Sequence, residues 1–74
     1  MLLYNKSKIL IKHKTKDLEY SITWKYNNKL SNYHVTSEKY VNGYLSPEYT
    51  TEYTVSSLDY LENLNIDNFI VKAY

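Results

Sequence analysis

The sequence predicts an α+β domain, with a small, mostly antiparallel sheet of four to five strands and one short helix packed on one face. Two observations carry this prediction. Apolar and polar side chains alternate over several short segments, as they do in strands with one buried face. Near the C-terminal end, leucines recur at every third position, which is typical of one face of a helix.

The longest alternation, from Leu18 to Tyr26, is the expected central strand. Its apolar side carries Tyr20, Ile22 and Trp24, the only tryptophan of the chain. Large aromatic side chains dominate the buried area of protein cores. We therefore expect the core to gather over this face.

The flanking residues predict two neighbouring strands. Residues 7–16 place isoleucines on one face and lysines on the other, and the polar segment 14–17 is short enough to turn the chain into an antiparallel hairpin with the central strand. Residues 1–5 are expected to extend this strand or to fray. Asn27-Asn28-Lys29 has turn chemistry, and a third strand is expected over residues 31–36.

Residues 37–47 allow two interpretations. Apolar residues between positions 40 and 45 fit one face of a short helix, but Asn42-Gly43 is the strongest hairpin-turn dipeptide in the chain. A glycine in the middle of a helix costs about 1 kcal/mol relative to alanine. We therefore expect a turn or loop around Asn42-Gly43 that protrudes from the sheet.

The C-terminal third supplies the remaining elements. Residues 49–55 alternate as a strand rich in Thr and Tyr. A two-turn helix is expected over residues 57–64, capped by the serines before it, with its leucines against the central strand. Residues 69–74 form the last predicted strand. No repeat or linker interrupts the chain, so residues 1–74 are expected to form a single domain.

The small size of the chain limits its stability. It has 74 residues and no cysteine for a disulfide or a thiolate metal site. Self-association is the common remaining way to stabilise so small a domain, and we expect a homodimer. No apolar run reaches the length of a signal peptide or a membrane span. We therefore expect a soluble, untargeted protein with no membrane partner.

The sequence has no recognisable catalytic centre. Its single glycine excludes glycine-rich nucleotide loops, and the absence of Cys and Arg removes a nucleophile and a phosphate clamp. His13 and His34 lie in different predicted strands, and His34 has no second ligand at metal-binding spacing. We predict a protein that is not an enzyme and that uses no cofactor or metal.

Charge divides unevenly along the chain. Residues 1–39 carry eight lysines against three acids, a net charge of +5, and residues 40–74 carry one lysine against five acids, a net charge of −4, which together give the +1 of the whole chain. Carboxylates among tyrosines suit a positively charged protein partner. The carboxylates attract the partner electrostatically and speed its association, and the tyrosine rings supply contact area in the complex. The predicted partner-binding residues are Tyr44, Glu48, Tyr49, Glu52, Tyr53, Asp59 and Glu62.

The lysines of the first strand suggest an alternative. Lysines on an edge strand are most simply a solvated face that discourages aggregation. They could also track the phosphates of a single-stranded nucleic acid, with Trp24 or exposed tyrosines as stacking platforms. The residues of this alternative site are Lys8, Lys12, Lys14 and Lys16. The net charge is far from that of a strongly basic nucleic-acid binder, so a protein partner is favoured.

The chain is very short, free of cysteine and rich in Lys, Asn and Tyr. In this character it resembles the small early proteins by which phages of low-GC Gram-positive bacteria disable a host factor, and among them the sliding-clamp inhibitors of Twort-like staphylococcal phages. The resemblance implies a dimer in the host cytoplasm that occupies the basic DNA channel of the DNA polymerase III β-clamp, with residues 48–67 as the contacting stretch. Anti-CRISPR proteins share this profile, and an inhibitor of that kind is a further alternative.

Overall fold

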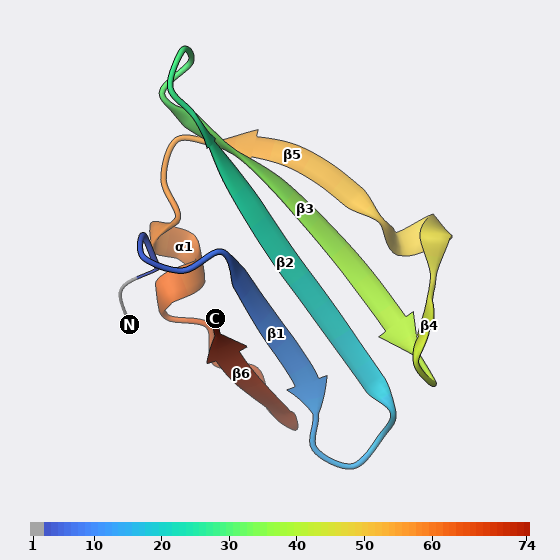
Figure 1. Cartoon of the computed structure of the whole chain (residues 1–74). Helices are drawn as coiled ribbons and strands as arrows, with labels where there is room; N and C mark the ends of the chain where they lie inside the picture. Colours follow the sequence, from blue (N-terminus) through green and yellow to red (C-terminus); the bar gives the residue numbers. More distant parts are fainter. Residues whose placement is uncertain (1–2) are drawn as a thin grey trace.

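The computed structural model describes residues 3–74, which form six strands, a 3-10 turn and one short helix (Figure 1). In chain order these are β1 (Lys8–His13), β2 (Leu18–Asn27), β3 (Asn32–Val41), β4 (Tyr44–Leu45), η1 (Pro47–Tyr49), β5 (Thr51–Val55), α1 (Asp59–Glu62) and β6 (Phe69–Ala73).

All strand pairings are antiparallel and belong to one sheet with the order β4-β3-β2-β1-β6. The long β2–β3 hairpin forms its centre. β5 also pairs with β3, along residues 33–37, whereas β4 pairs only with the last two residues of β3. β4 and β5 therefore share one edge of the sheet, and β6 forms the other.

The predicted α+β class is wrong, because the described chain is mostly antiparallel sheet with a single helical turn. The helix expected over residues 57–64 is reduced to the four residues of α1. Ser57 makes a local turn, in which its Oγ accepts the N–H of Asp59 at 3.1 Å, and the Asn and Asp residues that follow α1 are weak helix formers. The leucine spacing thus indicates buried positions and not helix length. Among the described residues, no helix has the length and apolar character needed to cross a membrane.

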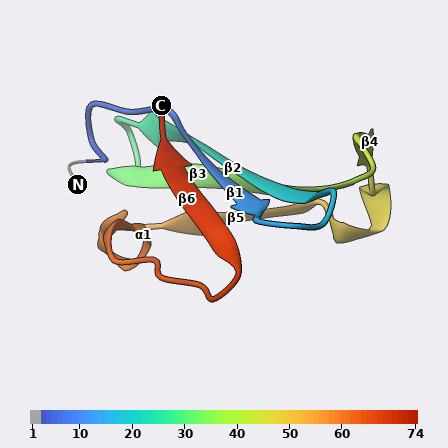
Figure 2. The same ribbon diagram turned by 90° about the horizontal axis from the view of Figure 1, so that it is seen from below.

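The two faces of the sheet differ in character. Figure 2 shows α1 and the segment leading into β6 on one side of the sheet, which we call the inner face; the opposite side is the outer face. On the inner face the register aligns Ile9 with Ile22. It also aligns Val35 with Trp24 in β2 and with Tyr53 in β5. The predicted alternation of the central strand is therefore confirmed.

The core is aliphatic at its centre and aromatic at its margin. The buried apolar residues are Leu3, Ile9, Ile11, Ile22, Val35, Leu58 and Leu61. Trp24 is only partly buried, and its indole N–H donates to the carbonyl oxygen of Lys6 at 3.1 Å. The core does gather over the predicted face of β2, but Trp24 lies at its edge.

The start of the chain packs into the core instead of extending β1 or fraying. Leu3 is fully buried. Its N–H donates to Oε1 of Glu62 at 3.3 Å, and the hydroxyl of Tyr4 donates to Oδ1 of Asp59 at 2.9 Å. The prediction that residues 1–5 extend the strand or fray is therefore wrong for residues 3–5. Residues 1 and 2 lie outside the part of the chain that the structure describes. The burial of Leu3 over α1 explains the difference.

The turn at Asn42-Gly43 is confirmed. Both residues have positive φ, 53° for Asn42 and 81° for Gly43, as the two-residue turns of β-hairpins require. The third strand does not stop at residue 36 but continues to Val41, so that β4 can pair with its end. Tyr49, predicted to begin the strand of residues 49–55, belongs to η1.

Candidate protein-binding surface

The predicted acidic, tyrosine-bearing residues do not form one surface. Tyr44, Glu48 and Tyr49 lie together at β4 and η1, and Glu52 follows on β5. Asp59 and Glu62 lie in α1, which Figure 1 shows at the opposite end of the molecule. The charge pattern along the chain could not reveal this separation, because it depends on where β5 carries the chain.

Asp59 and Glu62 hold the start of the chain in place. Each of the two carboxylates accepts one hydrogen bond from the segment of Leu3 and Tyr4. A carboxylate that accepts a hydrogen bond within the protein has less capacity left for a cationic partner. These two residues are therefore assigned to the fold and not to the binding surface.

Tyr53 is likewise a structural residue. Its side chain is half-buried against the core, and its hydroxyl lies 2.8 Å from the hydroxyl of Tyr60. Burial, reinforced by this hydrogen bond, raises the pKa of Tyr60 far above its ordinary range. The pair joins β5 to α1 and leaves little of the Tyr53 ring for a partner.

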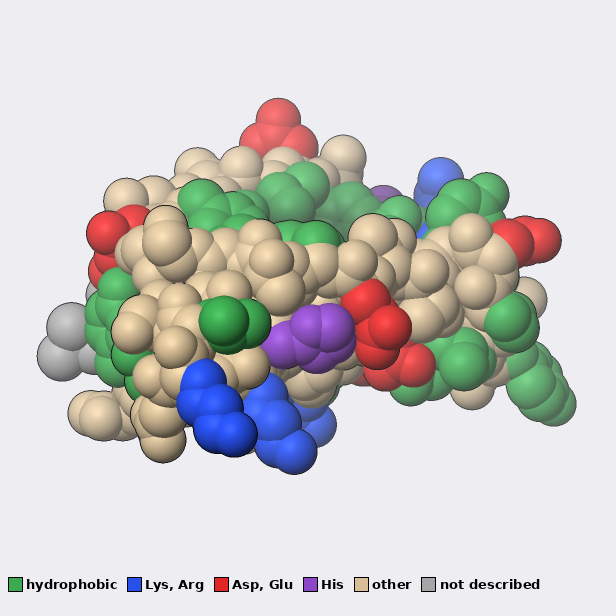
Figure 3. Space-filling view, turned by 90° about the horizontal axis from the view of Figure 1, so that it is seen from above, with side chains coloured by type: hydrophobic (Ala, Val, Ile, Leu, Met, Phe, Trp, Pro, Cys, Tyr) green, Lys and Arg blue, Asp and Glu red, His purple; other side chains and the backbone are tan. Residues whose placement is uncertain are grey.

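Exposed apolar side chains gather instead around β4. Together with Glu48 they form the β4 corner, defined here as Val41, Tyr44, Leu45, Glu48 and Tyr49. Its four apolar members are all exposed, and Tyr44 most of all at 79%. Figure 3 shows hydrophobic side chains, with an acidic group beside them, at the end of the molecule where β4 and η1 lie. In the register Val41 lies opposite Tyr44, whereas Leu45 lies opposite Tyr40 and so points to the other face of the sheet. Exposed apolar groups that gather at one end of a protein mark candidate interaction sites.

Sequence reasoning missed Val41 and Leu45 as members of this surface. Val41 precedes Asn42-Gly43 and Leu45 follows it by two residues, so a hairpin there places them at the end of β3 and on β4, at the edge of the sheet. A two-residue edge strand buries neither of its faces fully. The turn dipeptide was therefore the signal that could have found them.

Local bonds fix the shape of the corner. The N–H of Ser46 donates to the carbonyl of Lys39 at 2.9 Å, and Pro47 then begins η1, whose turn is closed by a bond from Tyr49 to Ser46 at 3.0 Å. Proline suits a first helical position, because its φ is already set. Nζ of Lys39 lies 4.2 Å from the centre of the Tyr49 ring. This cation–π contact favours the position of the ring over Lys39.

Acidic groups continue from the corner along the outer face. Glu52 lies opposite Thr36 in the register, and Glu38 is two residues further along β3. Oε1 of Glu52 is 3.6 Å from Nε2 of His34. The acidic surface thus comprises Glu48, Glu52 and Glu38, of which only the first two were predicted.

The predicted lysine set is also divided. Lys8 and Lys12 lie on the outer face of β1, whereas Lys14 and Lys16 belong to the turn that follows. Their expected aromatic partner Trp24 lies on the inner face and does not join them. The structure brings Tyr74 there instead, with Nζ of Lys8 and of Lys72 at 5.7 and 5.3 Å from the centre of its ring. A hollow of about 140 Å³ between Leu10, Ile70 and Tyr74 adjoins them.

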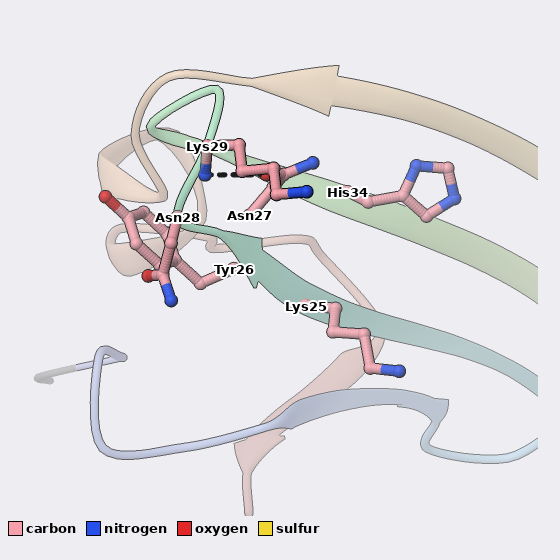
Figure 4. Close-up of a pocket in the computed structure, with 6 residues that line it drawn as sticks. All are labelled: Lys25, Tyr26, Asn27, Asn28, Lys29 and His34. Atoms are coloured by element: carbon pink, nitrogen blue, oxygen red, sulfur yellow. Dashed lines mark hydrogen bonds between the residues drawn. The ribbon is translucent and has the colours of Figure 1, made fainter.

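A second hollow, of about 420 Å³, lies at the β2–β3 turn (Figure 4). Figure 4 shows Lys25 and His34 on adjacent strands, well apart from Tyr26. Oδ1 of Asn27 accepts the N–H groups of Lys29 and Leu30 and so shapes the turn. The hollow is open, and the side chains that line it are exposed to solvent.

The two histidines are accounted for by local contacts. Nδ1 of His13 accepts the N–H groups of Thr15 and Lys16 at 3.1 and 3.0 Å, and so closes the β1–β2 turn. His34 contacts Glu52. Within residues 3–74, no group of three His, Cys, Asp or Glu side chains could hold a metal ion.

Comparison with known protein families, characterised proteins and solved structures finds no match to this chain.

Proposed function

We propose that this protein is a binding protein without catalytic activity, which engages a basic protein surface through the β4 corner. The observation that carries the proposal is the exposure of four apolar side chains beside Glu48, at a hairpin and a 3-10 turn that are held by their own hydrogen bonds. Tyrosines in such a setting are frequent anchors of protein interfaces.

Charge supports a basic partner. Glu48, Glu52 and Glu38 extend from the corner over the outer faces of β3 and β5. Such a cluster speeds the encounter with a positively charged surface and disfavours acidic partners. The apolar residues then supply the contact area that holds the complex.

The sequence character makes the sliding clamp of a bacterial host the first partner to test. In that case the protein acts in the host cytoplasm as a phage inhibitor of DNA replication, and the β4 corner contacts the basic lining of the DNA channel. Occupation of the channel blocks loading of the clamp onto DNA. An inhibitor of another host protein with a basic surface, such as an anti-CRISPR protein, would use the corner in the same way.

The test is a titration of purified clamp with paired variants. Tyr44→Ala should weaken binding at least tenfold, as expected for an interface anchor, while Tyr74→Ala at the other sheet edge should have little effect. Glu48→Lys should weaken it by repulsion, while the same charge change at Asp67 should not. Circular dichroism confirms that each variant folds. Clamp binding that is unaffected by Tyr44→Ala and Glu48→Lys would refute the proposed surface.

The arrangement of Lys8 and Lys72 around Tyr74 favours a second candidate function, single-stranded nucleic-acid binding. In this case Tyr74→Ala should reduce the affinity for an oligonucleotide, and Tyr44→Ala should not. Affinity should also fall steeply with salt, because lysines that neutralise phosphates release counterions. The two tyrosine variants therefore distinguish the candidates.

A further inference from the structure

The outer edge of β6 is a pairing surface that the monomer leaves open. β6 is the last strand of the sheet order, and its only strand partner in the described chain is β1. Exposed edge strands are usually protected by proline, by bulges or by several charges. β6 has the sequence Phe-Ile-Val-Lys-Ala, in which Lys72 is the only such residue. Ile70 is 58% exposed beside it.

The hydrogen-bond alternation shows which groups are free at this edge. Tyr74 and Lys8 exchange backbone bonds, in which each N–H donates to the other's carbonyl oxygen at 2.8 and 3.4 Å. In an antiparallel pair every second residue points its N–H and C=O at the partner strand. Lys72 and Ile70 therefore face β1, and the backbone groups of Val71 and Ala73 point outward.

We propose that a second copy of this chain pairs with β6, antiparallel and centred on Val71, so that one sheet runs through both copies. Val71 then exchanges backbone bonds with its own counterpart. A twofold axis at this residue gives a closed, self-complementary interface. It also keeps both inner faces, with their α1 turns, on the same side.

The side chains of β6 are complementary under this symmetry. On the inner face, the large Phe69 lies opposite the small Ala73 of the other copy. On the outer face, Lys72 lies opposite Ile70, so no two like charges are directly paired. The two Lys72 side chains take a diagonal position, roughly 7–8 Å apart, from which both can extend into solvent.

This inference does not rest on the proposed function. The β4 corner and β6 lie at opposite edges of the sheet, so the two corners remain accessible at the ends of the dimer. Loss of pairing through β6 and loss of partner binding can therefore be measured separately.

Charge variants of the exposed Ile70 test the pairing by sedimentation equilibrium. Ile70→Lys places a lysine opposite each Lys72 and should raise the dimer dissociation constant roughly tenfold. Ile70→Glu places a carboxylate there and should lower it. Leu30→Lys adds the same charge at a residue 67% exposed in the β2–β3 turn, and should leave the constant unchanged.

A charge exchange tests the register. In the double variant Ile70→Lys/Lys72→Glu, each new lysine faces a glutamate of the other copy, and dimer formation should be restored. In addition, Ile70→Cys creates the only thiol of the chain. In the proposed dimer the two introduced thiols, one from each copy, lie diagonally across the paired β6 strands, where a short bis-maleimide can join them. Leu30→Cys should not cross-link. A monomer at all accessible concentrations, or a dimer equally sensitive to Ile70→Lys and Leu30→Lys, would overturn the proposal.

Discussion

Two groups of tyrosines contribute to the fold as well as to the surface. The hydroxyls of Tyr53 and Tyr60 bond each other, and burial together with this bond raises the pKa of Tyr60. Desolvation, with Tyr4 and Tyr26 nearby, also raises the pKa of Tyr33. The many tyrosines of the sequence therefore include residues that stabilise the native state only while they remain protonated.

Stability should fall in alkaline solution for this reason. A raised pKa in the folded state means that the unfolded chain releases its proton first. The stabilisation is complete below a pH of about 10 and is lost as the pH rises towards the folded-state pKa. Urea denaturation across this range should show a shallower decline for Tyr60→Phe than for the wild type. Tyr44→Phe, in the exposed corner, should keep the wild-type slope, and equal slopes in all three proteins would contradict the prediction.

Leu3 is the residue whose importance is least visible in the sequence. It is fully buried although it lies close to the chain start, and it contacts the core that includes Leu58 and Leu61. Leu3→Ala should reduce the free energy of unfolding by about 2–5 kcal/mol, from lost burial and the cavity left behind. Urea denaturation measures this. Leu30→Ala, at an exposed turn, is the control and should change stability little; similar values for both variants would show that Leu3 is not a core residue.

At the scale of elements, the β3–β4 hairpin determines the candidate site. Its turn positions Val41 and Tyr44 as a pair on the short edge of the sheet. Gly43 has a φ of 81°, and a side chain at this position would meet open space. Conformational strain, without any steric clash, therefore decides which residues the position accepts.

Gly43→Ala should destabilise the protein by about 1 kcal/mol, because alanine disfavours positive φ. Gly43→Asn should cost less, since asparagine adopts this conformation more readily. Chemical denaturation gives the two values, and the order of the variants is the test. If the hairpin orients the β4 corner, Gly43→Ala should also weaken partner binding more than Gly43→Asn does.

At the scale of the whole molecule, the strands at the centre of the sheet are paired along more of their length than those at its edges. β2 is paired along both edges, with β1 and with β3. β4 has two residues and pairs with β3 alone. The candidate site thus lies on an element with little support of its own, as is common for binding elements.

Amide hydrogen exchange should reflect this gradient. The amides of β2 that bond to β1 or β3 should exchange only on global unfolding, whereas those of β4 and η1 should exchange through local opening and be faster. Exchange followed by NMR resolves the two groups. Equal protection of β4 and β2 would show that the corner opens only with the whole domain.

Local sequence determined much of the sheet. The alternation of residues 18–26 predicted β2 and its buried face, and Asn42-Gly43 predicted the protruding turn, because strand periodicity and turn conformation are properties of adjacent residues. Tyr44, Glu48 and Tyr49 of the corner were predicted from the acidic and tyrosine-rich composition of residues 40–74. Val41 and Leu45 were not, since their exposure depends on β4 being a short edge strand.

Only the tertiary structure decided which residues meet. The burial of Leu3, the use of Asp59 and Glu62 to hold the first residues, and the separation of α1 from the β4 corner all depend on contacts between distant parts of the chain. The leucine spacing near residue 60 predicted a longer helix. The same spacing of leucines arises when residues of a short turn and the loops beside it are buried against a sheet. Local preferences are small compared with the energy of such burial, so the packing of the sheet determined the mostly β fold and the composition of its surfaces.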